Sequence, residues 1–174
     1  MNKIFLKPKK EQFLHRRHPW IFSGAIGKKE GQFSDGDEVE VFSHRGAFLV
    51  KGHYHDGSIA VRILTYEQVP FDIDFWKERL GSARRYRETL GLFRDEKTNC
   101  YRLVHGAGDQ LSGLVVDAYG DTAVLQCHSI GMHRERENIA QAICDVFPEI
   151  KAVYDKSTET LPARYAAEDR KSVV

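Results

Sequence analysis

The sequence predicts an α+β protein with two small domains, and three observations support this. Residues 38–64 contain three short strand-like segments joined by tight turns, which is typical of a small β-barrel. Residues 100–155 follow a different order of strand, strand, strand, helix and strand, a β-β-β-α-β arrangement. A basic helical segment separates the two patterns. The chain has 174 residues, enough to give each of two small domains its own core.

In the N-terminal half, turn residues set the strand boundaries. Ser34-Asp35-Gly36-Asp37 predicts a turn, and two later breaks have a similar composition. Val39 and Val41 alternate with glutamates, as expected for a half-buried strand. We place the first domain at residues 1–70, with its last strand closing near Thr65. The expected elements are strands at 3–6, 38–42, 47–53 and 59–64 and a short helix at 10–16.

A basic helix is expected from Phe75 to about Leu90, with Asp74 as its N-cap and Gly91 as its stop signal. Its apolar residues do not form one clean stripe, and basic side chains cover much of the remaining surface. We therefore interpret residues 71–99 as a basic linker helix. It is either simply solvated or a second contact for nucleic acid.

The second domain is expected at residues 100–157. Gly120-Asp121 has the length and composition of a two-residue hairpin turn, and Pro148 ends the single helix. Residues 158–174 are interpreted as a tail. The expected elements are strands at 100–104, 113–119, 122–128 and 152–155 and a helix at 134–147.

The composition is that of a globular protein that does not enter a membrane. Hydrophobic residues make up 41% and charged residues 29% of the chain. No apolar run approaches the roughly 20 residues of a membrane helix, and residues 1–10 lack the apolar core of a signal peptide. Cys100, Cys127 and Cys144 are widely spaced and odd in number. We expect reduced thiols, each packed as a small buried hydrophobe, in a cytoplasmic protein.

Charge is distributed unevenly along the chain. Residues 1–29 contain eight lysines and arginines and one acidic residue, a net charge of +7. Residues 31–75 carry a net charge of −5 and residues 76–94 a net charge of +4. A chain polarised in this way can present a cationic face to nucleic acid even though its overall net charge is only +1.

The most informative stretch runs from Leu14 to Ile26. Arg16 and Arg17 carry planar guanidinium groups, whose paired donors suit phosphate oxygens. The Trp20-Ile21-Phe22 run that follows is expected to be buried beneath them as an anchor. A plainer interpretation also holds, in which the segment is an ordinary helix end with solvated arginines and a core tryptophan.

No catalytic or metal site is predicted. His53 and His55 share one strand face, but no third ligand is placed beside them. The segment His105-Gly106-Ala107-Gly108-Asp109 lacks the Lys-Ser/Thr of a phosphate-binding loop and precedes a strand, so we interpret its glycines as turn residues with positive φ. Because these glycines precede a strand instead of a helix, and no other strand-to-helix turn carries a glycine cluster, the sequence also lacks a dinucleotide or S-adenosylmethionine fingerprint.

Several motifs, in order along the chain, resemble one family. His18-Pro19-Trp20-Ile21-Phe22-Ser23-Gly24-Ala25-Ile26 after a basic segment is similar to the start of the PUA domain in bacterial S-adenosylmethionine-dependent methyltransferases that make 5-methylcytosine in large-subunit ribosomal RNA. Residues 46–54 and 58–64 resemble later strands of that domain. Residues 101–109, 113–117 and 154–157 resemble the family's central domain.

The resemblance implies a PUA-like first domain and ribosomal RNA as the partner, with no role for DNA or a membrane; self-association is left open. S-adenosylmethionine is the cofactor expected for the full-length family, and none is expected in this chain. After Ser157 the resemblance decays, so we expect the chain to end before the Rossmann-like catalytic domain, which carries the family's catalytic cysteines. The candidate RNA-binding residues are Arg16, Arg17, His18, Lys28, Lys29, Arg84 and Arg85.

Two alternatives to an RNA-recognition portion of a methyltransferase remain open from the sequence. One is a self-contained RNA-binding module that acts without a catalytic domain. The other is a protein-interaction scaffold, in which the sheet of the second domain recruits a partner.

Overall fold

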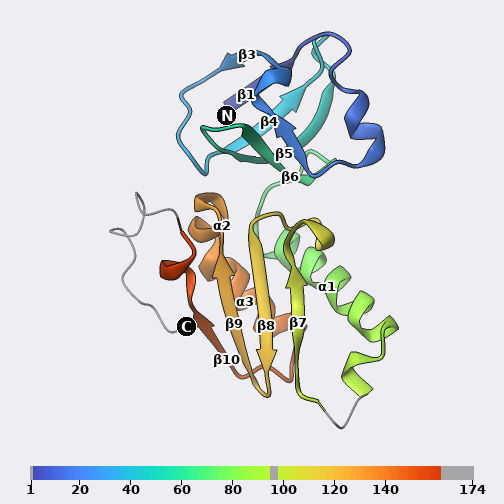
Figure 1. Cartoon of the computed structure of the whole chain (residues 1–174), viewed down its shortest axis with the longest axis vertical. Coiled ribbons are helices and arrows are strands. Elements are labelled where there is room, and N and C mark those ends of the chain that lie inside the picture. Colours follow the sequence, from blue (N-terminus) through green and yellow to red (C-terminus); the bar gives the residue numbers. More distant parts are fainter. Residues whose placement is uncertain (1, 95–97, 162–174) are drawn as a thin grey trace. The chain divides into compact units, whose positions relative to one another are not determined.

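The computed structural model describes residues 2–94 and 98–161, and the chain divides into two units between Val69 and Pro70 (Figure 1). The first unit is a curled β-sheet, and the second is a sheet with helices on one face. The expected mixed α/β architecture is confirmed. No helix within these described residues is both long enough and apolar enough to span a membrane.

The first unit is a six-stranded sheet with the order β2-β6-β5-β4-β1-β3. Its pairs are antiparallel except for β1 and β4, which run parallel. Two short 3₁₀ helices, η1 (Gln12–Arg16) and η2 (Ser23–Ala25), connect the first three strands. The strands are β1 (Asn2–Leu6), β2 (Trp20–Phe22), β3 (Ile26–Glu30), β4 (Glu38–Phe42), β5 (Phe48–Tyr54) and β6 (Ile59–Thr65).

Aliphatic side chains from successive strands form the core of the first unit. Ile4, Ile21, Val39, Val41 and Val61 are all inaccessible to solvent. Fully burying a side chain of this kind stabilises a fold by about 1.5–3 kcal/mol, so the core is the main source of stability. The burial of both valines of β4 confirms the alternation expected from the sequence.

The opposite face of β4 is less exposed than that alternation suggests. Glu40 is also buried, and its carboxylate accepts a hydrogen bond from Gln68 Nε2 at 2.8 Å. On the adjacent strand Lys51 is buried, with its Nζ 2.8 Å from Glu38 and 2.9 Å from the carbonyl oxygen of Val69. The chain that follows β6 therefore covers this face, and each of the two buried charged groups has a polar partner.

Gly52 is needed where β5 and β6 pair, because a Cβ there would overlap the carbonyl oxygen of Arg62 and lie 3.0 Å from Ile63 Cα. We expect Gly52→Ala to destabilise the first unit by about 3 kcal/mol, as overpacking a rigid backbone does. Gly24→Ala is the matched control, since a Cβ at Gly24 has no neighbour within 4 Å. Urea unfolding of 5-fluorotryptophan-labelled protein, followed at Trp20 by ¹⁹F NMR, checks this; similar midpoints for both variants would contradict it.

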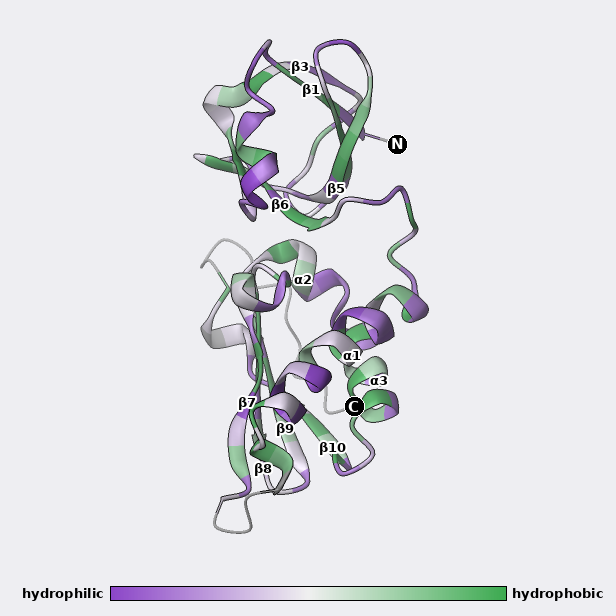
Figure 2. Ribbon diagram, turned by 90° about the vertical axis from the view of Figure 1, so that its right-hand side faces the viewer, coloured by the Kyte–Doolittle hydropathy of each residue, from purple (hydrophilic) through white to green (hydrophobic). Residues whose placement is uncertain are grey.

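The second unit is a four-stranded sheet with the order β10-β9-β8-β7. The strand β8 is antiparallel to both neighbours, and β10 runs parallel to β9. Helices α1 and α3 lie together against one face of the sheet (Figures 1 and 2). The elements are α1 (Ile73–Thr89), η3 (Leu92–Arg94), β7 (Cys100–His105), η4 (Gly106–Asp109), β8 (Leu114–Tyr119), β9 (Thr122–Cys127), α2 (Ile130–Arg134), α3 (Arg136–Val146), β10 (Ala152–Asp155) and η5 (Ser157–Glu159).

The expected linker helix is instead an integral part of the second unit. In α1, Trp76 and Leu80 are inaccessible to solvent, and Trp76 Nε1 donates to Glu135 Oε2 at 3.2 Å. Arg87, which the sequence suggested lies on the surface, is buried in an ion pair with Asp109 of η4. Hydrophilic and hydrophobic residues alternate along the helix (Figure 2), and several of its basic side chains pair with carboxylates of the same unit.

Several local expectations are corrected. Asp72, and not Asp74, caps α1, since its Oδ1 accepts from Phe75 N at 3.0 Å. Gly106 has the expected positive φ of 51°, but Gly108 lies in η4 and Gln110 takes the left-handed conformation. Cys100 is exposed rather than buried. The helix expected at 134–147 is α3, and the short helix α2 before it was not expected.

Candidate nucleic-acid interface

The candidate interface is built on η1 and the strand that follows it. Leu14 is buried in the core of the first unit and Phe13 packs against it, so η1 is anchored on its inner side. The helix ends at Arg16, as expected, because Arg17 adopts a left-handed conformation with φ of 50°. This conformation is uncommon for a residue other than glycine, and it redirects the chain from η1 toward β2.

Arg16 and Arg17 are both exposed, and their guanidinium groups form no hydrogen bond or ion pair with any other described residue. Arg17 lies over the ring of Tyr66, 5.0 Å from its centroid. Burial raises the pKa of Tyr66, and the neighbouring Arg17 charge opposes that rise. Stacking on a ring leaves the N–H groups at the edge of a guanidinium free, so both arginines can bind phosphate oxygens.

His18 packs among aromatic rings beside the two arginines. Its Nδ1 lies 3.2 Å from the backbone nitrogen and 3.0 Å from the carbonyl oxygen of Trp20. Its ring packs among those of Phe13, Trp20 and Phe22, with centroid distances of 5.7 to 6.3 Å. His18 is therefore a packing residue that shapes the surface, with one ring nitrogen already engaged by the backbone.

Phe22 corrects the expectation of a buried Trp20-Ile21-Phe22 anchor. Only Ile21 is buried; Trp20 is half-buried and Phe22 is 49% exposed. The pairing of β2 with β6 shifts register between Ile21 and Phe22, at the edge of the sheet. Alternation along a strand could have revealed this, because a buried Ile21 places both of its neighbours on the opposite face.

The two lysines of β3 have partners of their own. Lys28 Nζ lies 2.5 Å from Glu30 Oε1, and Lys29 Nζ donates to the Tyr54 hydroxyl at 2.6 Å. Lys29 also lies over the rings of Tyr54 and Phe33. Because consecutive residues of a strand point to opposite faces, the two ammonium groups do not act together on one phosphate.

The two candidate arginines of α1 belong to the second unit and differ from each other. Arg84 is bound by Glu88 and Glu149 and donates to the Val146 carbonyl oxygen, so a phosphate would have to displace two carboxylates. Arg85 is exposed and donates to Ser82 Oγ at 2.8 Å, with no carboxylate partner among the described residues. Of the pair, only Arg85 keeps a charge available for an anion.

The arrangement on the first unit combines two kinds of contact. Arg16 and Arg17 supply unpaired positive charge, and Phe22 supplies an exposed ring beside the half-buried Trp20 and His18. Proteins that bind single-stranded RNA use cations for the phosphate backbone and aromatic faces on which bases stack. We call Arg16, Arg17 and Phe22 the cationic-aromatic surface.

Comparison with known proteins agrees with the fold of the first unit. Residues 4–66 match the PUA-like domain family. The chain is 36% identical over 157 residues to the ribosomal RNA large subunit methyltransferase I of Escherichia coli strain SMS-3-5, and equally so to that of Citrobacter koseri. Both alignments cover 89% of this chain and 39% of the relative.

Two solved structures have a similar fold. A putative S-adenosylmethionine-dependent methyltransferase from Streptococcus mutans has a TM-score of 0.76 and 20% identity, over 90% of this chain and 41% of that one. A putative methyltransferase complexed with S-adenosylhomocysteine has a TM-score of 0.77 and 20% identity, over 92% of this chain and 41% of that one. At this identity the likeness concerns the fold.

The first unit is therefore a PUA-like domain. The chain as a whole is homologous to the N-terminal part of ribosomal RNA large subunit methyltransferase I. It spans about two fifths of the length of the curated relatives that it matches, 39% in each case.

Proposed function

We propose that this chain is the RNA-recognition portion of an S-adenosylmethionine-dependent ribosomal RNA methyltransferase and that it acts in the cytoplasm, where ribosomal RNA lies. The observation that carries the proposal is the cationic-aromatic surface on a PUA-like domain. Arg16 and Arg17 have no acidic partner among the described residues, and they precede His18, whose ring packs against that of the exposed Phe22. The chain that carries them is homologous to part of a ribosomal RNA methyltransferase.

RNA recognition and methyl transfer are assigned to different parts of the full-length protein. The first unit binds the phosphate backbone through Arg16 and Arg17 and stacks an unpaired base on Phe22. We assign the cofactor and the methyl transfer to the part of the full-length protein outside the aligned region, which is 39% of the relative. We propose C5 of a cytosine as the methylated position, on the resemblance of the motifs between His18 and Ser157.

The chemical identity of the product is tested in cells that lack the gene. We expect their large-subunit ribosomal RNA to lose one 5-methylcytosine, detected by nuclease digestion and mass spectrometry. Loss of a different methylated nucleotide would contradict cytosine C5 as the target. An unchanged set of modifications, together with RNA binding by the purified chain, would favour a self-contained RNA-binding module. A chain that binds no RNA would favour the protein-interaction scaffold.

Phe22 gives a prediction specific to stacking. Phe22→Ala should weaken the binding of single-stranded RNA by about tenfold, within the 1–3 kcal/mol that one base–aromatic contact supplies. It should destabilise the first unit by less than about 1 kcal/mol, because the ring is already half exposed. Fluorescence anisotropy with labelled RNA measures the first effect, and urea unfolding measures the second.

Tyr154→Ala is the matched control, since Tyr154 is 44% exposed and lies on the second unit. The control variant should bind RNA as the unmodified chain does. Equal losses for the two variants would show that exposed aromatic rings contribute without regard to position. That result would remove Phe22 from the interface.

A further inference from the structure

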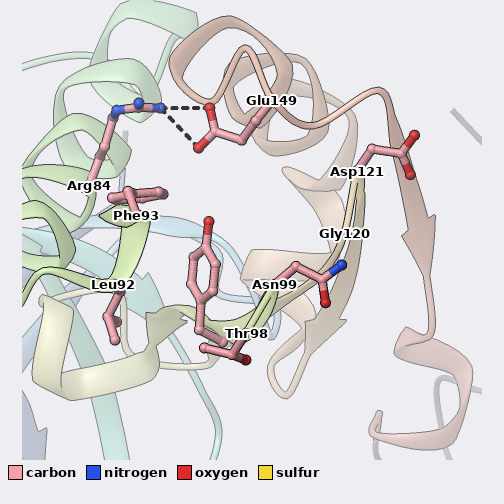
Figure 3. Close-up of a pocket in the computed structure, with 9 residues that line it drawn as sticks. Arg84, Leu92, Phe93, Thr98, Asn99, Gly120, Asp121 and Glu149 are labelled. Carbon is pink, nitrogen blue, oxygen red and sulfur yellow. Dashed lines mark hydrogen bonds and ion pairs between the residues drawn. The ribbon is translucent and has the colours of Figure 1, made fainter. Parts of the chain in front are cut away.

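A cavity of about 540 Å³ lies in the second unit. Figure 3 shows the Arg84–Glu149 ion pair on one side, with Thr98 and Asn99 across from it and Phe93 below Arg84. These residues come from α1, η3, the segment before β7 and the segment before β10. Its volume is within the 300–1,000 Å³ typical of small-molecule sites.

Aromatic rings that are held in place form part of the lining. Phe93 and Tyr101 meet edge to face with centroids 5.3 Å apart. Phe93 is further fixed by the buried Phe147 and by the Arg84 guanidinium, 4.9 Å from its centroid. Rings that are already positioned lose little conformational freedom when a ligand arrives, which favours binding of a flat molecule.

Polar groups in the lining are left without protein partners. The Tyr101 hydroxyl forms no hydrogen bond with any other described residue, and the same holds for Asn99 Nδ2. Burial, and after it the Glu149 carboxylate, raise the pKa of Tyr101, so this hydroxyl stays protonated and can donate as well as accept. Asn99 adds an amide donor. The exposed Asp121 adds carboxylate acceptors at the rim, although its Oδ1 also accepts from Thr122 Oγ1 at 3.3 Å.

The charge of the lining argues against a phosphate as the ligand. The charges of Arg84 and Glu149 cancel in their ion pair, and Asp121 leaves the lining with a net negative charge. A neutral molecule that donates hydrogen bonds from amino groups fits both this net charge and the carboxylate acceptors of Asp121. Adenine and cytosine have this chemistry, because each presents an exocyclic amino group beside a ring nitrogen that accepts.

We propose that this cavity binds one unpaired RNA base that carries an exocyclic amino group, adenine or cytosine. The base packs against the aromatic lining, donates its amino group to Asp121, and accepts at its ring nitrogen from Asn99 or Tyr101. This inference rests on the proposed RNA-binding function, and it adds a base-selective site in the second unit. Its neighbouring phosphates stay outside the cavity.

Nucleosides test the cavity without the rest of the RNA. Adenosine, cytidine, uridine and ribose 5-phosphate are titrated in turn into the ¹⁵N-labelled full chain. We expect adenosine and cytidine to shift the amide signals of Asn99, Tyr101 and Asp121, uridine to shift them less, and ribose 5-phosphate to leave them unchanged. No shift with any nucleoside, or shifts with ribose 5-phosphate alone, would overturn the proposal.

Two variants make the test specific. Tyr101→Phe removes only the hydroxyl and should weaken adenosine binding by about twofold to tenfold, the range for one hydrogen bond. Asp121→Asn keeps the shape but introduces an amide donor, so it should shift the preference from cytidine toward uridine. Tyr154→Phe, at an exposed tyrosine outside the lining, is the matched control and should change neither. Unchanged selectivity in Asp121→Asn would overturn the assigned role of this carboxylate.

Failure of this inference is distinguishable from failure of the proposed function. If RNA binds through Arg16 and Arg17 but nucleosides leave the cavity signals unchanged, the cavity assignment is wrong and RNA recognition by the first unit stands. If nucleosides bind the cavity but the chain binds no RNA, the proposed function is wrong and the cavity belongs to a free nucleoside or nucleobase.

Discussion

Replacing both Arg16 and Arg17 with alanine is expected to weaken RNA binding by about 25-fold at 0.1 M salt. Each phosphate contact contributes about 0.7 to the dependence of log K on log salt for single strands, so losing two contacts should lower that slope by about 1.4. The folded structure should be unaffected, because both side chains are exposed. Anisotropy titrations over a series of salt concentrations measure the affinity and the slope together.

A charge-matched control removes Lys9 and Arg45 from the same unit. Both are exposed, Lys9 in the turn between β1 and η1 and Arg45 in the turn between β4 and β5. The control variant should lose less than about threefold in affinity, through the weaker overall field alone. If it lowered the slope as much as the arginine pair does, net charge rather than the cationic-aromatic surface would be responsible.

Asp109→Ala is expected to destabilise the second unit by about 3–5 kcal/mol, because it leaves the buried Arg87 guanidinium without its counter-charge. The two side chains are 6% and 7% exposed, and Arg87 Nη2 donates to Asp109 Oδ2 at 2.8 Å. Asp109 also accepts from the backbone nitrogen of His105, so its removal leaves a second donor unpaired. The two units need not unfold together, so Trp76 in the second unit is followed by ¹⁹F NMR of 5-fluorotryptophan-labelled protein during urea unfolding.

Asp109→Ala leaves both the Arg87 charge and the His105 N–H without a partner. The double variant Arg87→Met with Asp109→Leu removes the charge and leaves only the N–H unpaired. Replacing a buried ion pair by apolar side chains of similar volume is often close to neutral, so the double variant should be more stable than Asp109→Ala. The Trp20 signal of the first unit should be unchanged in both variants. A cost below about 1 kcal/mol for Asp109→Ala would contradict the assignment of this ion pair to the core.

Much of the fold could be predicted from local patterns. The strands expected at 38–42 and 152–155 are β4 and β10 with the same bounds, because alternating valines or turn residues mark their limits. The Gly120-Asp121 hairpin is also present, with Tyr119 paired with Thr122 and a positive φ at Gly120. These features depend on neighbours in the chain, which a single sequence contains.

The features that sequence did not predict depend on distant partners. Arg84 and Arg87 look like surface charges in the sequence, but the carboxylates that bind them, Glu149 and Asp109, lie 65 and 22 residues away. Phe22 is an exception, because its exposure follows from alternation with the buried Ile21 along β2 and could have been predicted locally. Tertiary pairing therefore decides which of these basic side chains are available to an anion.

The most direct test of RNA recognition by the first unit is an NMR titration of the ¹⁵N-labelled full chain with a mixed-sequence single-stranded RNA of about 16 nucleotides. We expect the amide signals of residues 15–18 and 20–22 to shift at the lowest RNA ratios, and to stop shifting when Arg16 and Arg17 are replaced. RNA binding that leaves these signals unchanged, whatever happens at the cavity of the second unit, would contradict the account.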